Sequence, residues 1–177
     1  MVYVLLVEGF EEIEALEPVD IMRRAGLEVR TVGVTDKTVT GSHGITVEAD
    51  IEICDVNPDQ MQLLMLPGGS GHVNLDSSKD VHYLIDTACE KGIYIASICA
   101  APSILGKRGL LNGKKATCFP GYEKYLEGAE VCADKAVCDG IFITGKGAGA
   151  AADFGFLIVE LLCGADKAKE LRGVMQY

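Results

Sequence analysis

The chain has 177 residues, 49% of them hydrophobic, and is long enough to bury about 70% of its unfolded surface without disulfides or a structural metal. Its formal net charge of −10 and isoelectric point near 4.7 argue against nucleic acids and anionic membrane surfaces as partners, because binding to either calls for a basic surface. We therefore expect a single domain spanning residues 1–177, with small molecules or proteins as partners.

The N-terminal apolar run, Met1 to Phe10, has no basic leader and is far shorter than the roughly 20 residues of a membrane span. The seven cysteines are odd in number and form no CxxC pair, which predicts reduced thiols in a cytoplasmic protein. Three scattered histidines, none spaced near a second ligand, predict no metal site.

Strand-like and helix-like segments alternate along the chain, a pattern typical of an α/β fold with helices on both faces of a mostly parallel sheet. Pro18 is expected to bend or divide the first helix, and turn residues at 36–41 predict a small hairpin. The expected strands are Val2–Val7, Leu27–Val34, Ile45–Ala49, Gln62–Leu66, Ile93–Ile98, Lys115–Phe119, one near Val131, Lys135–Cys138 and Ile141–Thr144. The expected helices are Glu11–Ala25, Val81–Lys91, one starting at Ala100, a short one near 121–126, Ala150–Cys163 and Asp166–Val174.

The most informative stretch runs from Ile93 to Gly106. Its β-branched apolar run is typical of a buried strand that stops at Cys99, and Ala100-Ala101-Pro102 predicts a helix start, because proline is tolerated in a first helical turn. Free backbone N–H groups and the helix dipole would then point at the sulfur and lower its pKa. Cys99 is therefore the candidate nucleophile. The other cysteines are assigned to packing: Cys54, Cys89, Cys118, Cys132, Cys138 and Cys163.

Ligands bind beyond the carboxyl ends of parallel strands, where the strand order reverses. Three loops are expected to meet there: residues 8–11, residues 67–71 and the turn at Cys99 itself. The first loop leads into Glu11 and Glu14, which share a helix face. Either carboxylate could move protons for the sulfur, or simply complement the helix dipole. The second loop contains Gly68-Gly69, which is either a plain turn or, with the N–H of Ala100, an oxyanion hole.

Two glycine-rich segments imitate nucleotide-binding motifs. Gly140–Lys146 begins like a phosphate-binding loop but lacks the required Ser or Thr, and 147–152 begins like a dinucleotide fingerprint without the second strand that should follow. Both are interpreted as close backbone packing. His43, His72 and His82 are expected at the surface, and only His43 is a candidate contact at the edge of the site.

Motifs along almost the whole chain carry a family resemblance. The segments Glu8–Ala15, Pro18–Gly26, Leu66–Gly69, Ile98–Pro102 and Gly147–Ala150 resemble the ThiJ/PfpI superfamily, and most closely the branch of the parkinsonism-associated deglycase and its bacterial relatives. The resemblance implies a flavodoxin-like, doubly wound fold of the class I glutamine amidotransferase type. It also implies a homodimer.

Roles for individual residues follow from the same resemblance. Cys99 is similar to the family's redox-sensitive nucleophile, and Glu14 to the protonated carboxyl that donates a hydrogen bond to its thiolate. Glu11 matches a second acid of that pocket, and Gly69 and Ala100 match the backbone N–H donors.

Three positions depart from relatives within the superfamily. Ala100 stands where the protease-like branch has histidine, which disfavours a Cys-His peptidase. Phe119 stands where some members have histidine before the proline, and His43 replaces a basic residue of the early hairpin loop. Proton transfer would then depend on Glu14 or water.

The resulting hypothesis is a cysteine-dependent enzyme that needs no cofactor and detoxifies reactive carbonyls, as glyoxalase III or a protein deglycase does. Cys99 would attack methylglyoxal, glyoxal or an early glycation adduct of a protein to form a hemithioacetal. Two alternatives remain open: a redox-sensing stress protein or chaperone whose Cys99 oxidises to a sulfinate, and an isocyanide hydratase-like hydrolysis by the same thiolate.

Overall fold

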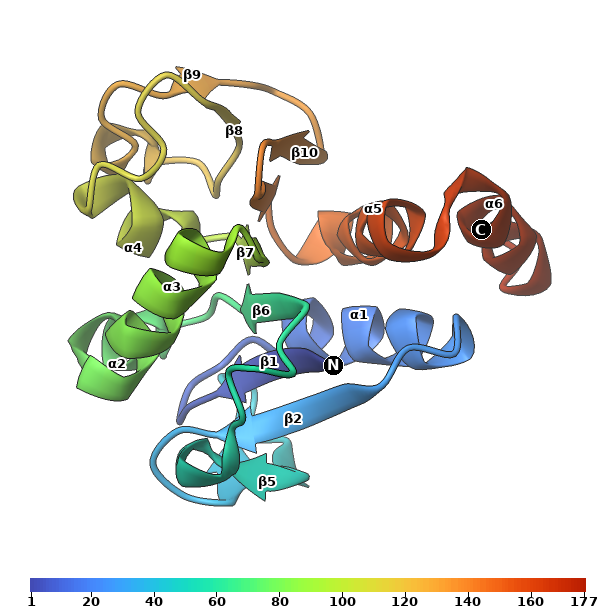
Figure 1. Ribbon diagram of the computed structural model, residues 1–177, viewed down its shortest axis with the longest axis horizontal. Coiled ribbons are helices and arrows are strands. Elements are labelled where there is room, and N and C mark those ends of the chain that lie inside the picture. Colours follow the sequence, from blue (N-terminus) through green and yellow to red (C-terminus); the bar gives the residue numbers. More distant parts are fainter.

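The computed structural model describes residues 1–177. Its centre is a seven-stranded sheet in the order β10-β11-β7-β6-β1-β2-β5 (Figure 1). Every neighbouring pair is parallel except β10 with β11. The strands are β1 (Val2–Leu6), β2 (Val29–Gly33), β5 (Ile51–Glu52), β6 (Leu63–Leu66), β7 (Tyr94–Ile98), β10 (Ala136–Asp139) and β11 (Phe142–Gly145).

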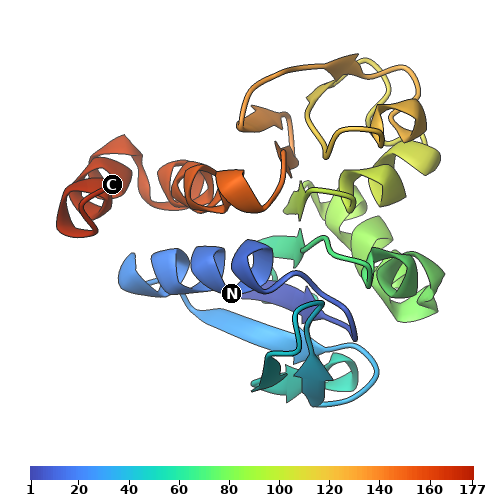
Figure 2. The same ribbon diagram turned by 180° about the vertical axis from the view of Figure 1, so that it is seen from behind.

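Helices cover both faces of the sheet, with α1, α5 and α6 on one side and α2, α3 and α4 on the other (Figures 1 and 2). They are α1 (Glu12–Arg24), α2 (His72–Ser77), α3 (Lys79–Lys91), α4 (Pro102–Lys107), α5 (Ala151–Cys163) and α6 (Ala165–Val174). Successive residues of β1 face opposite ways, so Val4 packs in the core beneath α1 and α5, whereas Leu5 packs in the core beneath α3 and α4. No helix combines the length and apolar character needed to cross a bilayer.

The strand order reverses between β1 and β6. From β1 the chain first adds β2 on one side, and then adds β6, β7 and β11 in turn on the other side. This is the flavodoxin-like, doubly wound order that the sequence predicted. The loops after β1, β6 and β7 therefore all lie at the carboxyl ends of these parallel strands, beside the point where the strand order reverses.

Smaller elements complete the chain. The predicted hairpin is formed by β3 (Thr38–Thr40) and β4 (Thr46–Glu48), and β8 (Lys115–Ala116) pairs with β9 (Glu130–Val131). The expected strand Lys115–Phe119 is thus shorter in the structure, because its last residues turn toward the site. Short 3₁₀ turns cover Ile53–Asp55, Glu123–Tyr125 and Ala148–Ala150.

Pro18 does not divide α1, so that part of the expectation was wrong. The helix runs from Glu12 to Arg24 with Pro18 buried in it. Its neighbour is Gly155 of α5, where a β-carbon would lie 3.1 Å from the Pro18 Cα. Close packing of α5 against this stretch holds the helix together despite the missing hydrogen bond.

A pair of buried hydroxyls on β7 and β11 leads to a stability prediction. Ser97 and Thr144 are neighbours across the two strands, and both are fully buried. The Thr144 Oγ1 accepts a hydrogen bond from the N–H of Thr117 at 2.9 Å, whereas the Ser97 Oγ has no partner.

We expect Thr144→Val to lower the free energy of unfolding by about 1–3 kcal/mol, because it leaves the Thr117 N–H buried without an acceptor. Ser97→Ala should leave that free energy unchanged or raise it, because the hydroxyl it removes is unpaired. Urea unfolding of the two variants measures the difference. A larger loss in Ser97→Ala than in Thr144→Val would contradict this account.

Candidate active site

Cys99 lies on the turn between β7 and α4, where the sequence predicted it, and Pro102 takes the first position of α4. Its backbone is left-handed, with φ of +66°, a conformation that residues other than glycine seldom adopt. The Cys99 N–H donates to the carbonyl of Gly145 at 2.9 Å, and its carbonyl accepts from the N–H of Phe119 at 2.8 Å. These two bonds hold the strained turn in place.

Glu14 is the carboxyl that meets Cys99. It lies in the first turn of α1 and is only 1% exposed. Its Oε2 accepts a hydrogen bond from the N–H of Gly68 at 3.0 Å, and its carboxyl group shares a hydrogen bond with the Cys99 thiol. A β-carbon at position 68 would lie 2.5 Å from that oxygen and 2.6 Å from the Cys99 Cβ. Position 68 therefore has room only for glycine.

Glu11, expected as a second acid of the pocket, lies at the start of α1 beside Glu14. It caps α1, because its Oε2 accepts a hydrogen bond from the N–H of Glu14 at 2.7 Å. Its own N–H donates to the carbonyl of Gly68 at 3.1 Å. Glu11 thus ties the start of α1 to the loop after β6, and positions Glu14 rather than contacting the sulfur itself.

Two backbone N–H groups point at the Cys99 sulfur, those of Gly69 and Ala100. Gly69 has φ of +89°, and a β-carbon there would lie 2.5 Å from the N atom of Glu11. Donors in this position can stabilise a thiolate, or the negative oxygen of an adduct on the sulfur. The geometry therefore favours the oxyanion-hole interpretation over a plain turn for Gly69 with Ala100, whereas the N–H of Gly68, also expected there, is bound to the Glu14 carboxyl instead.

The site has an unusual pattern of proton affinities. Burial and the charge of Glu11 raise the pKa of Glu14 to about 7. Burial and the Glu14 carboxylate raise the pKa of Cys99 to about 12, although the N–H groups of Gly69 and Ala100 act in the opposite direction. The low thiol pKa expected for this turn is thus not what the structure produces, because that expectation left out the buried carboxylate.

Glu14 and Cys99 titrate as a pair because they share a hydrogen bond. Between about pH 7 and about pH 12 the pair holds one proton. A thiolate forms in that range only when the proton moves from the sulfur to the Glu14 carboxylate. Glu14 is therefore the group placed to accept a proton from Cys99.

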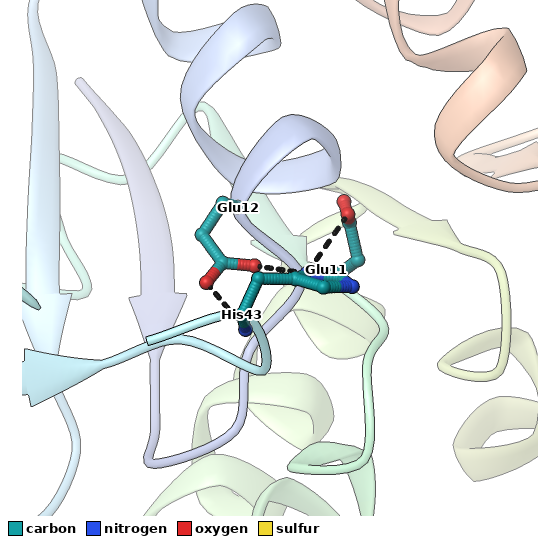
Figure 3. Close-up of side chains that lie close together, drawn as sticks. All are labelled: Glu11, Glu12 and His43. Carbon is teal, nitrogen blue, oxygen red and sulfur yellow. Dashed lines mark hydrogen bonds and ion pairs between the residues drawn. The ribbon is translucent and has the colours of Figure 1, made fainter. Parts of the chain in front are cut away.

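A second cluster lies beside the pair, formed by Glu11, Glu12 and His43 (Figure 3). The buried carboxylate of Glu12 accepts a hydrogen bond from the His43 N–H at 2.7 Å and lies 2.8 Å from the His43 Nδ1. Burial alone would raise the pKa of Glu12, but hydrogen bonds from His43 and Ile45 hold it below its usual value. The same contacts raise the pKa of His43, whose side chain is 70% exposed.

The sequence placed His43 at the edge of the site and indicated no role in the site for Glu12. The structure joins them across 31 residues, with His43 Nδ1 also 3.8 Å from the Glu11 carboxylate. Oxygen and imidazole atoms of the three side chains lie within 4.8 Å of one another, and such donors bind divalent ions. Hydrogen bonds that close the hairpin loop over α1 already account for this arrangement.

An open hollow of about 420 Å³ lies beside the reactive pair, lined by Phe119, Pro120, Lys135, Lys146 and residues 147–150. A β-carbon at Gly147 would lie 3.2 Å from the Phe119 ring and 3.9 Å from the Glu14 Oε1. The hollow therefore borders Glu14. The sequence assigned 147–150 to backbone packing, and no residue pattern indicated that this segment lines a cavity.

The fold and the site define a class: flavodoxin-like proteins with a cysteine on a strained strand-to-helix turn and a buried carboxyl beside it. The model of the DJ-1/PfpI family matches residues 1–161, and the chain belongs to this family. Among solved structures, a mutant of the DJ-1 superfamily protein STM1931 from Salmonella typhimurium is 31% identical, with a TM-score of 0.93 over 99% of this chain and 97% of that one. Oxidized DJ-1 from Toxoplasma gondii is 29% identical, with a TM-score of 0.94 over 99% and 97%.

Curated relatives show the same likeness. DJ-1 homolog B of Arabidopsis thaliana is 35% identical over 97% of this chain, which spans 40% of that protein's length. A deglycase of Pyrococcus abyssi is 32% identical over 73% of this chain and 78% of its own. The glutathione-independent glyoxalase DJR-1.2 of Caenorhabditis elegans is 31% identical over 93% and 89%.

The shared proton predicts a stepped pH profile for alkylation of Cys99 by iodoacetamide. The rate should rise as the pair loses its first proton near pH 7, stay level while one proton is shared, and rise again at high pH. Glu14→Gln should remove the step near pH 7, because an amide cannot accept the proton. Mass spectrometry of the Cys99 peptide separates this thiol from the other cysteines.

Glu11→Gln is the matched control, since it keeps an oxygen that can cap α1. Loss of the Glu11 charge should shift the step to lower pH without abolishing it, because that charge raises the pKa of Glu14. The same profile in the wild type and in Glu14→Gln would show that the pair does not share a proton.

Proposed function

We propose that this chain is a cysteine-dependent enzyme that converts reactive carbonyls without a cofactor, in the manner of a glyoxalase III or a deglycase. The observation that carries the proposal is the contact between the Glu14 carboxyl and the Cys99 thiol, facing the N–H groups of Gly69 and Ala100. The names of the Pyrococcus and Caenorhabditis relatives, a deglycase and a glyoxalase, support the same class of substrate.

In the first step the Cys99 sulfur attacks the aldehyde carbon of a 2-oxoaldehyde such as methylglyoxal. A carbon–sulfur bond forms, the π electrons of the carbonyl move to its oxygen, and Glu14 takes the thiol proton. The N–H groups of Gly69 and Ala100 stabilise the oxyanion, which then takes the proton from Glu14 to give a hemithioacetal and leaves Glu14 as a carboxylate again.

In the second step the Glu14 carboxylate removes the proton from the carbon bonded to sulfur and returns it to the neighbouring carbon. The first carbon is oxidised and the second is reduced, so no external redox partner is needed. Water then hydrolyses the resulting thioester and regenerates the thiol. The sum is one 2-oxoaldehyde plus one water giving one 2-hydroxy acid, which is lactate for methylglyoxal. A glycation adduct enters the same route after it releases its amine as the free aldehyde.

We also propose that the chain acts as one unit, as a cytoplasmic homodimer. The family match over residues 1–161 supports one unit. Ile13 and Ile45, which lie near the site and are 51% and 54% exposed, provide apolar surface of the kind that a second copy would cover.

Loss of the nucleophile is the direct test of the catalytic proposal. Cys99→Ala should lower kcat/KM for methylglyoxal by roughly 10³-fold or more, the scale seen when a catalytic nucleophile is removed. Cys89→Ala, which removes another half-buried thiol on α3, should retain activity. Lactate formed from methylglyoxal is the readout, and activity retained in Cys99→Ala would contradict the mechanism.

A redox sensor is the second candidate, favoured by the polar groups around the same sulfur. Two molecules of peroxide would convert the Cys99 thiolate to a sulfinate with release of two waters. The N–H groups of Gly69 and Ala100 and a protonated Glu14 could donate hydrogen bonds to its oxygens. The Toxoplasma structure named above is of an oxidized protein, which supports this candidate.

Graded peroxide followed by mass spectrometry tests the sensor. Cys99 should reach the dioxidised state before the other six cysteines, and Glu14→Gln should reduce that preference, because it removes the proton acceptor that allows the thiolate to form. Equal oxidation of all seven thiols would rule the sensor out.

A further inference from the structure

The hollow beside the reactive pair contains two lysines with different partners. Lys135 forms an ion pair with Asp153 at 2.8 Å, whereas the half-buried Lys146 contacts no carboxylate. Acidic residues outnumber basic ones in this chain by 26 to 16, so carboxylate partners are plentiful. A half-buried lysine without a carboxylate partner, on the lining of an apolar hollow, is a feature that its surroundings do not explain.

Lys146 follows directly on the strand that holds Cys99 in place. The carbonyl of the preceding residue, Gly145, accepts the hydrogen bond from the Cys99 N–H at 2.9 Å. The next residue, Gly147, packs against Phe119 and borders Glu14. A ligand bound to Cys99 can therefore extend past Gly147 and the Phe119 ring toward Lys146 without leaving the surface of the protein.

The two sides of the site differ in charge. On one side Glu11, Glu12 and His43 line a second hollow of about 280 Å³. On the other side lies the hollow with Lys146, where no acidic side chain forms part of the lining. An anionic group on a ligand is repelled by the first side and attracted by the second, so the charges would orient a ligand that carries an aldehyde at one end and an anion at the other.

We propose that the hollow with Lys146 binds the anionic end of a carbonyl substrate, and that Lys146 selects 2-oxoaldehydes bearing a carboxylate. The inference rests on the proposed function, since it places the aldehyde at Cys99. The apolar carbons of such a substrate lie along Phe119 and Gly147, and its carboxylate pairs with the Lys146 ammonium. A compound such as 4,5-dioxopentanoate has this chemistry, with two methylene groups between the oxoaldehyde and the carboxylate.

Two alkylating agents test the anion site without any turnover. Iodoacetate and iodoacetamide both form a carbon–sulfur bond with release of iodide, and differ chiefly in charge. We expect Lys146→Gln to lower the ratio of their rates at Cys99, iodoacetate over iodoacetamide, by about twofold to fivefold, the scale of one partly solvated ion pair. Lys146→Arg should keep the ratio near that of the wild type.

Lys91→Gln is the matched control, because it removes the same charge far from the site. Lys91 is the last residue of α3 and lies near the start of β7, whereas Cys99 follows the end of that strand. It should leave the ratio unchanged, although its ion pair with Asp59 is lost. A ratio that is the same in Lys146→Gln and the wild type, or that falls equally in Lys91→Gln, overturns the inference.

Turnover provides the second measurement. The ratio of kcat/KM for 4,5-dioxopentanoate over methylglyoxal should fall in Lys146→Gln, mainly through KM for the anionic substrate, and recover in Lys146→Arg. If neither aldehyde is turned over while the alkylation ratio still depends on Lys146, the proposed function fails and the anion site stands. If both are turned over with a substrate ratio independent of Lys146, the inference fails and the proposed function stands.

Discussion

The structure depends on one close approach, that of Gly68 to both Glu14 and Cys99. The loop after β6 passes so near the other two residues that a single methyl group at position 68 would overlap the carboxylate and the cysteine together. The Gly68 N–H binds Glu14 at 3.0 Å, and its carbonyl binds the Glu11 backbone, so one residue holds the start of α1 against the turn after β7. Three loops from distant parts of the chain meet because that residue has no side chain.

This convergence also decides the chemistry, because it places a carboxylate and a thiol together away from water. Burial raises the pKa of both groups and the Glu14 carboxylate raises that of Cys99 further, whereas the hydrogen bond with the Cys99 thiol lowers the pKa of Glu14, so the two groups titrate together. The backbone N–H groups of Gly69 and Ala100 lie where they can stabilise negative charge on the sulfur. In the proposed mechanism the buried acid and the cysteine therefore exchange a proton directly, with no histidine between them.

Local patterns in the sequence predicted the parallel sheet and the Cys99 turn, because buried strands have apolar runs that end at turn residues. They left Glu11 and Glu14 open as the acid beside the sulfur, and only the family resemblance singled out Glu14. They could not predict the raised thiol pKa, which depends on the burial of the sulfur and on its contact with Glu14, a residue 85 positions away in the chain. The role of Glu12 was missed for a similar reason, since its partner His43 lies in a hairpin loop. The short helix α2 follows a glycine-rich turn and has too few buried residues to show a helical period.

The left-handed backbone at Cys99 has a consequence for how this chain can change. A side chain in that conformation costs roughly 1–2 kcal/mol that glycine would not incur. Folding stability alone therefore favours glycine at position 99, and the proposed chemistry gives a reason why cysteine stands there at that cost. Among chains selected only for resistance to heat, we expect glycine to replace cysteine at this turn, with a gain in stability and the loss of the proposed activity.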